Sequence, residues 1–95
     1  MAQVELAAAA AEDLDRLILT HSLPANTNAR VQRTLQPLLR FPLLGAGLVG
    51  RWQDFRFVLG PWRWMVIVYA SLEDEDRVVA VTIQDGSSAA RTVSR

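Results

Sequence analysis

The side chains best suited to binding an anion in this 95-residue chain are arginines, because all ten basic residues are arginine. Six of them, with a single acid, lie between Arg30 and Arg63. Each guanidinium is a planar fork of donors that matches a phosphate or a carboxylate. A GC-rich genome, whose codons favour arginine and alanine, is the plain alternative explanation. Ten acidic residues balance the charge to zero, so a strongly basic nucleic-acid binder is not indicated.

Groups that could move a proton are scarce. Arginine stays protonated and is a poor base, which leaves Tyr69, Asp54, Asp85 and His21 as candidates. Histidine titrates near physiological pH. However, His21 ends a predicted helix that the pattern places away from the sheet, and the plainer interpretation is a histidine meeting the helix dipole.

Tyr69 alternates in phase with Arg63, Met65 and Ile67, which predicts one shared strand face. Tyr69 then belongs either to a site or to the core, with its hydroxyl at the core edge.

Aromatic residues occur among the arginines and could stack nucleic-acid bases. They are Trp52, Phe55, Phe57, Trp62 and Trp64. Core packing or a partner-binding surface is the more common use of aromatic residues in a sheet. Cysteine is absent, and neither a metal-ligand spacing nor a phosphate-binding glycine motif occurs. We therefore expect neither a metal nor a cofactor.

Two amphipathic helices are predicted in the first half of the chain. Apolar residues recur at helical spacing from Ala7 to His21, after a short alternating strand at residues 3–6. A second stripe runs from Val31 to Leu39, with possible caps at residues 26–28. Pro37 lacks a backbone donor and should kink this helix without abolishing it. The short connection between the two predicts a helical hairpin.

Strand patterns dominate the second half. Glycines at 45, 47 and 50 suggest a flexible connector, followed by strands at residues 55–59, 62–71 and 77–85. The acidic run at residues 73–76 reads as a solvated hairpin turn, and the small, polar segment 86–95 as a loosely held tail.

These elements predict a single α+β domain over residues 1–95, with a helical hairpin packed on a small, mainly antiparallel four-stranded sheet. A hydrophobic content of 51% excludes disorder of the whole chain. No membrane-spanning run or signal peptide is recognisable, so we expect a cytoplasmic protein without membrane contacts.

The order and spacing of the elements resemble the RelE/ParE superfamily of type II toxin–antitoxin toxins. The resemblance covers nearly the whole chain, and no single motif in it is sharp. The segments that carry it are AAAAAEDLDRL, ARVQRTLQPLLRFPLLGAGL, RFVLGPWRWMVIVY and DRVVAVTIQD.

The resemblance implies a growth-inhibiting toxin held inactive by a cognate antitoxin. RelE-type members cut messenger RNA on the ribosome, whereas ParE-type members poison DNA gyrase. Arg63 matches the family's strand arginine that contacts phosphate, and Arg56 matches a basic position by region only. After the last strand, Arg91 is present, but the tyrosine or histidine usual in the nuclease branch is missing.

Three hypotheses therefore stay open. The first is a metal-independent messenger RNA endoribonuclease whose candidate catalytic residues are Arg63, Arg56, Tyr69 and Arg91. The second is a non-enzymatic gyrase poison, and the third is an attenuated toxin that mainly binds its antitoxin.

Overall fold

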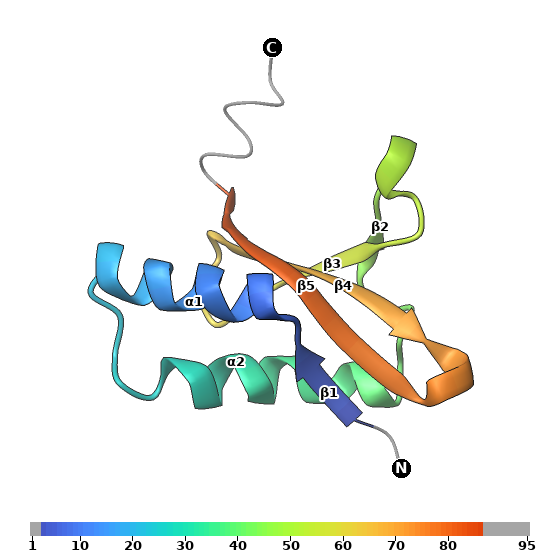
Figure 1. Ribbon diagram of the computed structural model, residues 1–95, viewed down its shortest axis with the longest axis horizontal. Coiled ribbons are helices and arrows are strands. Elements are labelled where there is room, and N and C mark those ends of the chain that lie inside the picture. Colours follow the sequence, from blue (N-terminus) through green and yellow to red (C-terminus); the bar gives the residue numbers. More distant parts are fainter. Residues whose placement is uncertain (1–2, 87–95) are drawn as a thin grey trace.

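A single five-stranded sheet carries the fold of this computed structural model, which describes residues 3–86 (Figure 1). The strands lie in the order β1-β5-β4-β3-β2, with β1 parallel to β5 and the other pairs antiparallel. In chain order the elements are β1 (Gln3–Leu6), α1 (Ala8–Thr20), α2 (Thr27–Leu35), β2 (Ala46–Gly47), β3 (Arg56–Leu59), β4 (Met65–Leu72) and β5 (Arg77–Asp85). The predicted α+β class is confirmed.

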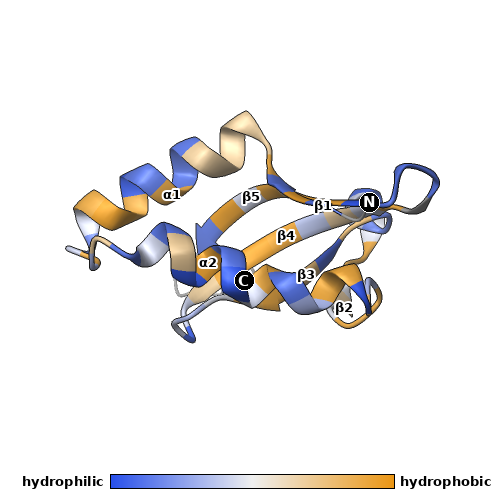
Figure 2. Cartoon of the chain, turned by 90° about the horizontal axis from the view of Figure 1, so that it is seen from below, coloured by the Kyte–Doolittle hydropathy of each residue, from blue (hydrophilic) through white to orange (hydrophobic). Residues whose placement is uncertain are grey.

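Both helices pack on the same face of the sheet. Met65, Ile67 and Tyr69 alternate along β4 and are fully buried, so they mark the helix-facing side. They form one cluster with the apolar stripes of the two helices and with buried residues of β5. The helical and strand members are Ala10, Leu14, Val31, Leu35, Leu38, Val78, Ala80 and Ile83. Figure 2 shows that α1 carries both hydrophilic and hydrophobic residues along its length.

Pro37 changes the type of the second helix. The α-helical part ends at Leu35, and a 3₁₀ turn continues it over Gln36–Leu39, with Pro37 in its first positions. Proline has no N–H to donate to the residue four before it, so the tighter turn takes over. Leu38 is still buried, and the apolar stripe therefore continues through the change.

The glycine-rich connector is more ordered than its composition suggests. Ala46 and Gly47 form the two-residue β2, which makes the sheet five-stranded and not four-stranded as predicted. Gly45 is buried, and a Cβ there would stand 2.5 Å from the carbonyl oxygen of Phe57 and 2.8 Å from the Tyr69 hydroxyl. Glycine is needed here because two chain segments approach so closely.

The last strand changes phase at Val81. Tyr69 pairs with Ala80, but its neighbour Val68 pairs with Thr82, so one residue of β5 is left over as a β-bulge. Buried positions accordingly step from Ala80 to Ile83 instead of alternating. A bulge shifts the inward and outward pattern by one residue, and Ile83 and the strand end beyond it turn toward the helices.

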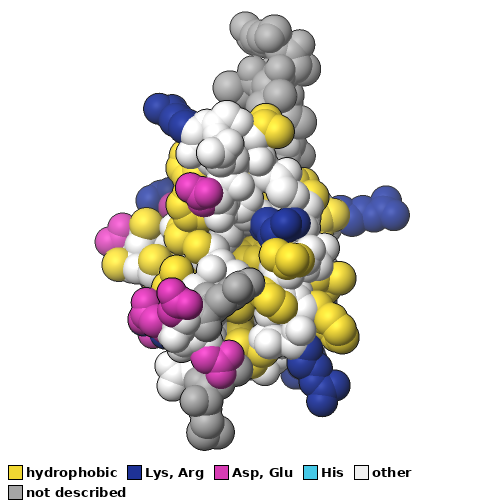
Figure 3. All heavy atoms as spheres, turned by 90° about the vertical axis from the view of Figure 1, so that its right-hand side faces the viewer, with side chains coloured by type: hydrophobic (Ala, Val, Ile, Leu, Met, Phe, Trp, Pro, Cys, Tyr) yellow, Lys and Arg dark blue, Asp and Glu magenta, His cyan; other side chains and the backbone are white. Residues whose placement is uncertain are grey.

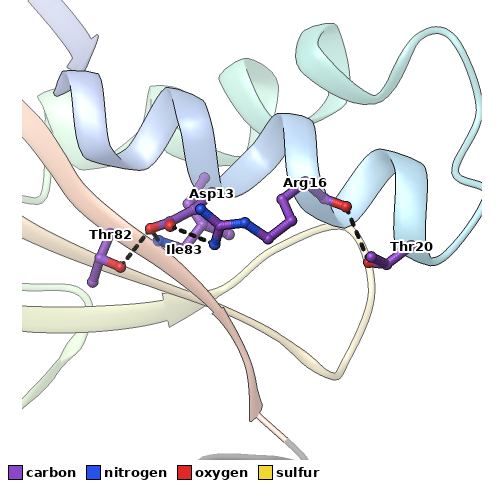
Figure 4. Close-up of polar contacts among 5 residues, drawn as sticks. All are labelled: Asp13, Arg16, Thr20, Thr82 and Ile83. Carbon is purple, nitrogen blue, oxygen red and sulfur yellow. Dashed lines mark hydrogen bonds and ion pairs between the residues drawn. The ribbon is translucent and has the colours of Figure 1, made fainter.

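Asp13 of α1 binds β5 beside this bulge (Figure 4). The ladder with β1 ends at the pair Leu6–Ala80, and the carboxylate then accepts bonds from the Ile83 N–H at 3.1 Å and the Thr82 hydroxyl at 2.7 Å. A second oxygen lies 3.4 Å from Arg16. The side chain thus replaces a strand neighbour at an exposed edge.

The acidic turn is solvated as predicted: Asp74, Glu75 and Asp76 are exposed. Residues 73–75 form a 3₁₀ turn, and Arg77 pairs with Glu75 and, across the sheet edge, with Glu5. Neither helix in the described part of the chain has the length and hydropathy of a membrane-spanning segment.

Replacing Asp13 by alanine should lower the free energy of unfolding by about 1.5–3 kcal/mol, because the Ile83 N–H loses a charged acceptor. Asp15→Ala on the same helix is the control, since Asp15 is exposed and is expected to cost less than about 0.5 kcal/mol. Urea denaturation measures both. Equal stability of the two variants would contradict the role given to Asp13.

Candidate functional site

Arg63 lies at the tip of the turn that joins β3 to β4. The Gly60 N–H donates to the Met65 carbonyl at 2.8 Å, and the Met65 N–H donates back to Trp62 at 3.0 Å. These bonds close a tight turn in which Arg63 is exposed. Because β4 begins only at Met65, Arg63 does not share the buried face of Ile67 and Tyr69, and the prediction of one common face is wrong for Arg63.

Arg56 and Tyr69 form a cross-strand pair at the opposite end of this hairpin. The Tyr69 hydroxyl donates to the Pro42 carbonyl at 2.6 Å and accepts the Gly45 N–H at 3.0 Å. Arg56 Nη1 donates to the Gly45 carbonyl at 2.9 Å. Tyr69 is fully buried. Both side chains therefore fasten the segment before β2, which fits the core interpretation of Tyr69.

The three predicted site residues that the structure describes, Arg56, Arg63 and Tyr69, do not converge on one site. Arg56 is the first residue of β3 and the turn that bears Arg63 follows the last, Leu59, so the length of the strand, about 10 Å, separates them. Arg91 lies outside the described residues, as does nearly all of the predicted tail at 86–95. Only Arg56 and Tyr69 are neighbours.

A stack of rings lies beside Arg63. The His21 and Trp64 rings are 4.3 Å apart at an interplanar angle of 20°. Trp62 and Trp64 follow at 6.2 Å and 23°. The Arg30 guanidinium covers Trp62 at 4.6 Å from the ring centroid, which is cation–π geometry. This series, which we call the Arg30–His21 stack, joins α2, the β3–β4 turn and the end of α1.

His21 also meets the end of the sheet. Its Nε2 lies 3.3 Å from Oδ2 of Asp85, the last residue of β5. The prediction that His21 is remote from the sheet is therefore wrong. The sequence identified His21 and Asp85 as separate candidates for proton transfer. Their pairing depends on the bulge at Val81, which turns Asp85 to the helix-facing side.

Three arginines of α2 and of the β3–β4 turn lack acidic partners in the described part of the chain. Among residues 3–86, Arg30, Arg33 and Arg63 form no ion pair with a carboxylate. A phosphate near the turn would meet guanidinium donors that are not already neutralised. Histidine and acidic side chains of the same residues do not gather in any group of three that could hold a metal ion.

Comparisons with known proteins show the fold. No protein-family model matches the sequence, and no curated protein matches it. Three similar solved structures are the RelBE2 toxin–antitoxin complex of Mycobacterium tuberculosis, the chromosomal ParDE toxin–antitoxin system of Pseudomonas aeruginosa and YafQ of Escherichia coli.

Each likeness spans almost the whole of both chains. RelBE2 is 21% identical at a TM-score of 0.64, covering 88% of this chain and 96% of that one. The ParDE chain is 14% identical to this one at a TM-score of 0.65, and the alignment covers 90% of this chain and 96% of that one. YafQ is 12% identical at a TM-score of 0.60, and the alignment covers 94% of this chain and 98% of that one.

A Tyr69→Phe substitution tests whether Tyr69 is structural. We expect the free energy of unfolding to fall by about 1–3 kcal/mol, because the Pro42 carbonyl and the Gly45 N–H would lose their partner inside the protein. Thr20→Val removes an exposed hydroxyl and should change stability by less than about 0.5 kcal/mol. Chemical denaturation gives both values, and unchanged stability of Tyr69→Phe would favour a site role instead.

Proposed function

We propose that this chain, which has the fold of the RelE/ParE-type toxins, is the toxin of a type II toxin–antitoxin module. The observation that carries the proposal is the full-length likeness to chains from toxin–antitoxin structures. Fold alone does not fix function, so the surface and the exposed cations must supply the rest.

An apolar surface on the segment before β3 supports an antitoxin partner. Large hydrophobic side chains are exposed over residues 41–52, and Val49 is 86% accessible. They are Phe41, Leu43, Leu44, Val49 and Trp52. Figure 3 views the molecule from the side of β2 and shows hydrophobic side chains at the surface with arginines between and beside them. A concentration of exposed apolar residues is typical of a protein-binding surface.

Expression with and without the neighbouring reading frame tests the module. We expect induction of this chain to arrest growth, and co-expression of a small acidic protein encoded beside it to relieve the arrest. Leu44→Asp should weaken that complex at least about tenfold, or ~1.4 kcal/mol, because it puts a charge into the apolar contact.

Leu19→Asp is the control for this binding measurement, because Leu19 is 81% exposed but lies on α1, outside the apolar segment. Calorimetric titration of purified toxin with antitoxin compares the two variants. Unhindered growth on induction would contradict the toxin role, and equal binding by Leu44→Asp would contradict the surface.

We further propose that the toxin cleaves messenger RNA on the ribosome without a metal, with Arg63 contacting the scissile phosphate. Arg63 is exposed, it has no carboxylate partner among residues 3–86, and it adjoins a stack of rings. Positive groups aimed at the charge that develops on a phosphate stabilise the transition state. The aromatic rings beside it are suited to a single-stranded substrate.

An Arg63→Ala variant should cleave ribosome-bound message at least about 100-fold more slowly, because the phosphate loses its fixed cation. Arg40→Ala removes another exposed arginine, at the end of the 3₁₀ turn, and should keep the wild-type rate. Primer extension on message from defined translation complexes measures both. Intact message under conditions of growth arrest would contradict the nuclease mechanism.

Poisoning of DNA gyrase is the alternative, and one observation favours it. Arg56 and Tyr69 bind the protein's own backbone instead of joining Arg63 around a common phosphate. A non-enzymatic toxin would not need such an arrangement. It would reduce supercoiling by purified gyrase and leave message intact, whereas an attenuated, antitoxin-binding relative would neither reduce supercoiling nor cleave message.

A further inference from the structure

We propose that His21 is the proton-transfer residue of the message-cleaving site and that Asp85 positions it. This inference rests on the nuclease mechanism proposed above. Attack by a ribose 2′-hydroxyl on the adjacent phosphate requires that the hydroxyl lose its proton as the new bond forms. Arg63 supplies a cation but cannot accept that proton, because a guanidinium stays protonated.

The two ring nitrogens of His21 are in different situations. Nε2 lies 3.3 Å from the Asp85 carboxylate, while Nδ1 has no hydrogen-bond partner among residues 3–86. The side chain is 35% exposed, so a substrate can approach it. A base held at one nitrogen by a carboxylate, with the other nitrogen open, is the arrangement used in proton-transferring enzymes.

Several contacts fix the ring in this position. Trp64 stacks on one face of the imidazole, and the Trp64 carbonyl accepts the Gly86 N–H at 2.5 Å. Met65 pairs with Asp85 across the two strands, so the indole and the carboxylate belong to one end of the sheet. His21 itself caps α1 through its N–H, 2.9 Å from the Leu17 carbonyl. Such support holds a catalytic group in place before substrate binds.

Arg63 and His21 belong to the same end of the molecule. Arg63 directly precedes Trp64, whose indole ring stacks on the His21 imidazole. The Cα atoms of Arg63 and Trp64, as of any two consecutive residues, are about 3.8 Å apart. Among residues 3–86, the charged group that pairs with His21 is Asp85 of β5. Arg30 of α2 lies over Trp62, and Arg63 lies in the turn next to Trp64.

In the reaction, neutral His21 accepts the proton of the 2′-hydroxyl at Nδ1 while the 2′-oxygen bonds to phosphorus. The bond from phosphorus to the 5′-oxygen breaks, and the leaving oxygen takes a proton from water. The hydroxide that remains takes the proton from the His21 imidazolium, which restores water and the neutral imidazole. The products are a 2′,3′-cyclic phosphate and a 5′-hydroxyl end, without any redox change. Arg63 stabilises the phosphorane charge, and Asp85 stabilises the imidazolium.

His21→Gln separates this role from a purely structural one. The glutamine amide can place a donor near the Nε2 position and keep the tie to Asp85, but it cannot carry a proton. We expect the single-turnover cleavage rate of ribosome-bound message to fall at least about 100-fold, with an unchanged melting temperature.

Asp85→Asn tests positioning. We expect a lower rate and an altered pH profile, with unchanged affinity for the ribosome complex, whereas Asp15→Asn on the outer side of α1 should match the wild type. His21→Ala offers a second measurement, because added imidazole should restore part of its activity if the missing group is a proton acceptor.

The possible failures are distinguishable. A wild-type protein that leaves message intact would refute the nuclease mechanism and this inference together. A wild-type protein that cleaves, with His21→Gln within threefold of its rate, would overturn the inference alone. Loss of activity in His21→Gln that follows a lowered melting temperature, with no rescue of His21→Ala by imidazole, would make His21 structural and also overturn it.

Discussion

The tie between Asp13 and the end of β5 is the contact on which the arrangement of this molecule depends. The parallel partner β1 ends opposite Ala80, so the backbone of β5 beyond the bulge at Val81 pairs with β4 on one side and has no strand on the other. Asp13 takes the Ile83 N–H at this point. Because a helix rises about 1.5 Å per residue, this contact also sets where the C-terminal end of α1 lies relative to the strand end.

The two ends of the β3–β4 hairpin consequently serve different purposes. At one end, Arg56 and Tyr69 bind the backbone before β2, and Gly45 leaves no room for a side chain. At the other end, the turn exposes Arg63 beside tryptophans that are anchored on both helices. The first end stabilises the sheet through buried hydrogen bonds, and the second leaves donors free for an anion.

The proposed toxin function joins these two surfaces in one small domain. Under this proposal an antitoxin would bind the apolar segment before β3. A nucleic-acid strand would meet a cation, rings and a histidine at the turn with the Arg30–His21 stack.

The sequence by itself determined the helices, the three long strands and the importance of the arginines, because helical and alternating periodicities follow from which face is buried. It also predicted that residues 3–6 form a strand, but not that this strand is parallel to its neighbour. It missed β2, because two residues are too few to show an alternating pattern. The pairing of His21 with Asp85 was decided by tertiary structure alone. A one-residue bulge reverses which side chains face the helices, and nothing in the near-continuous apolar run from Val78 to Ile83 marks where that residue is inserted.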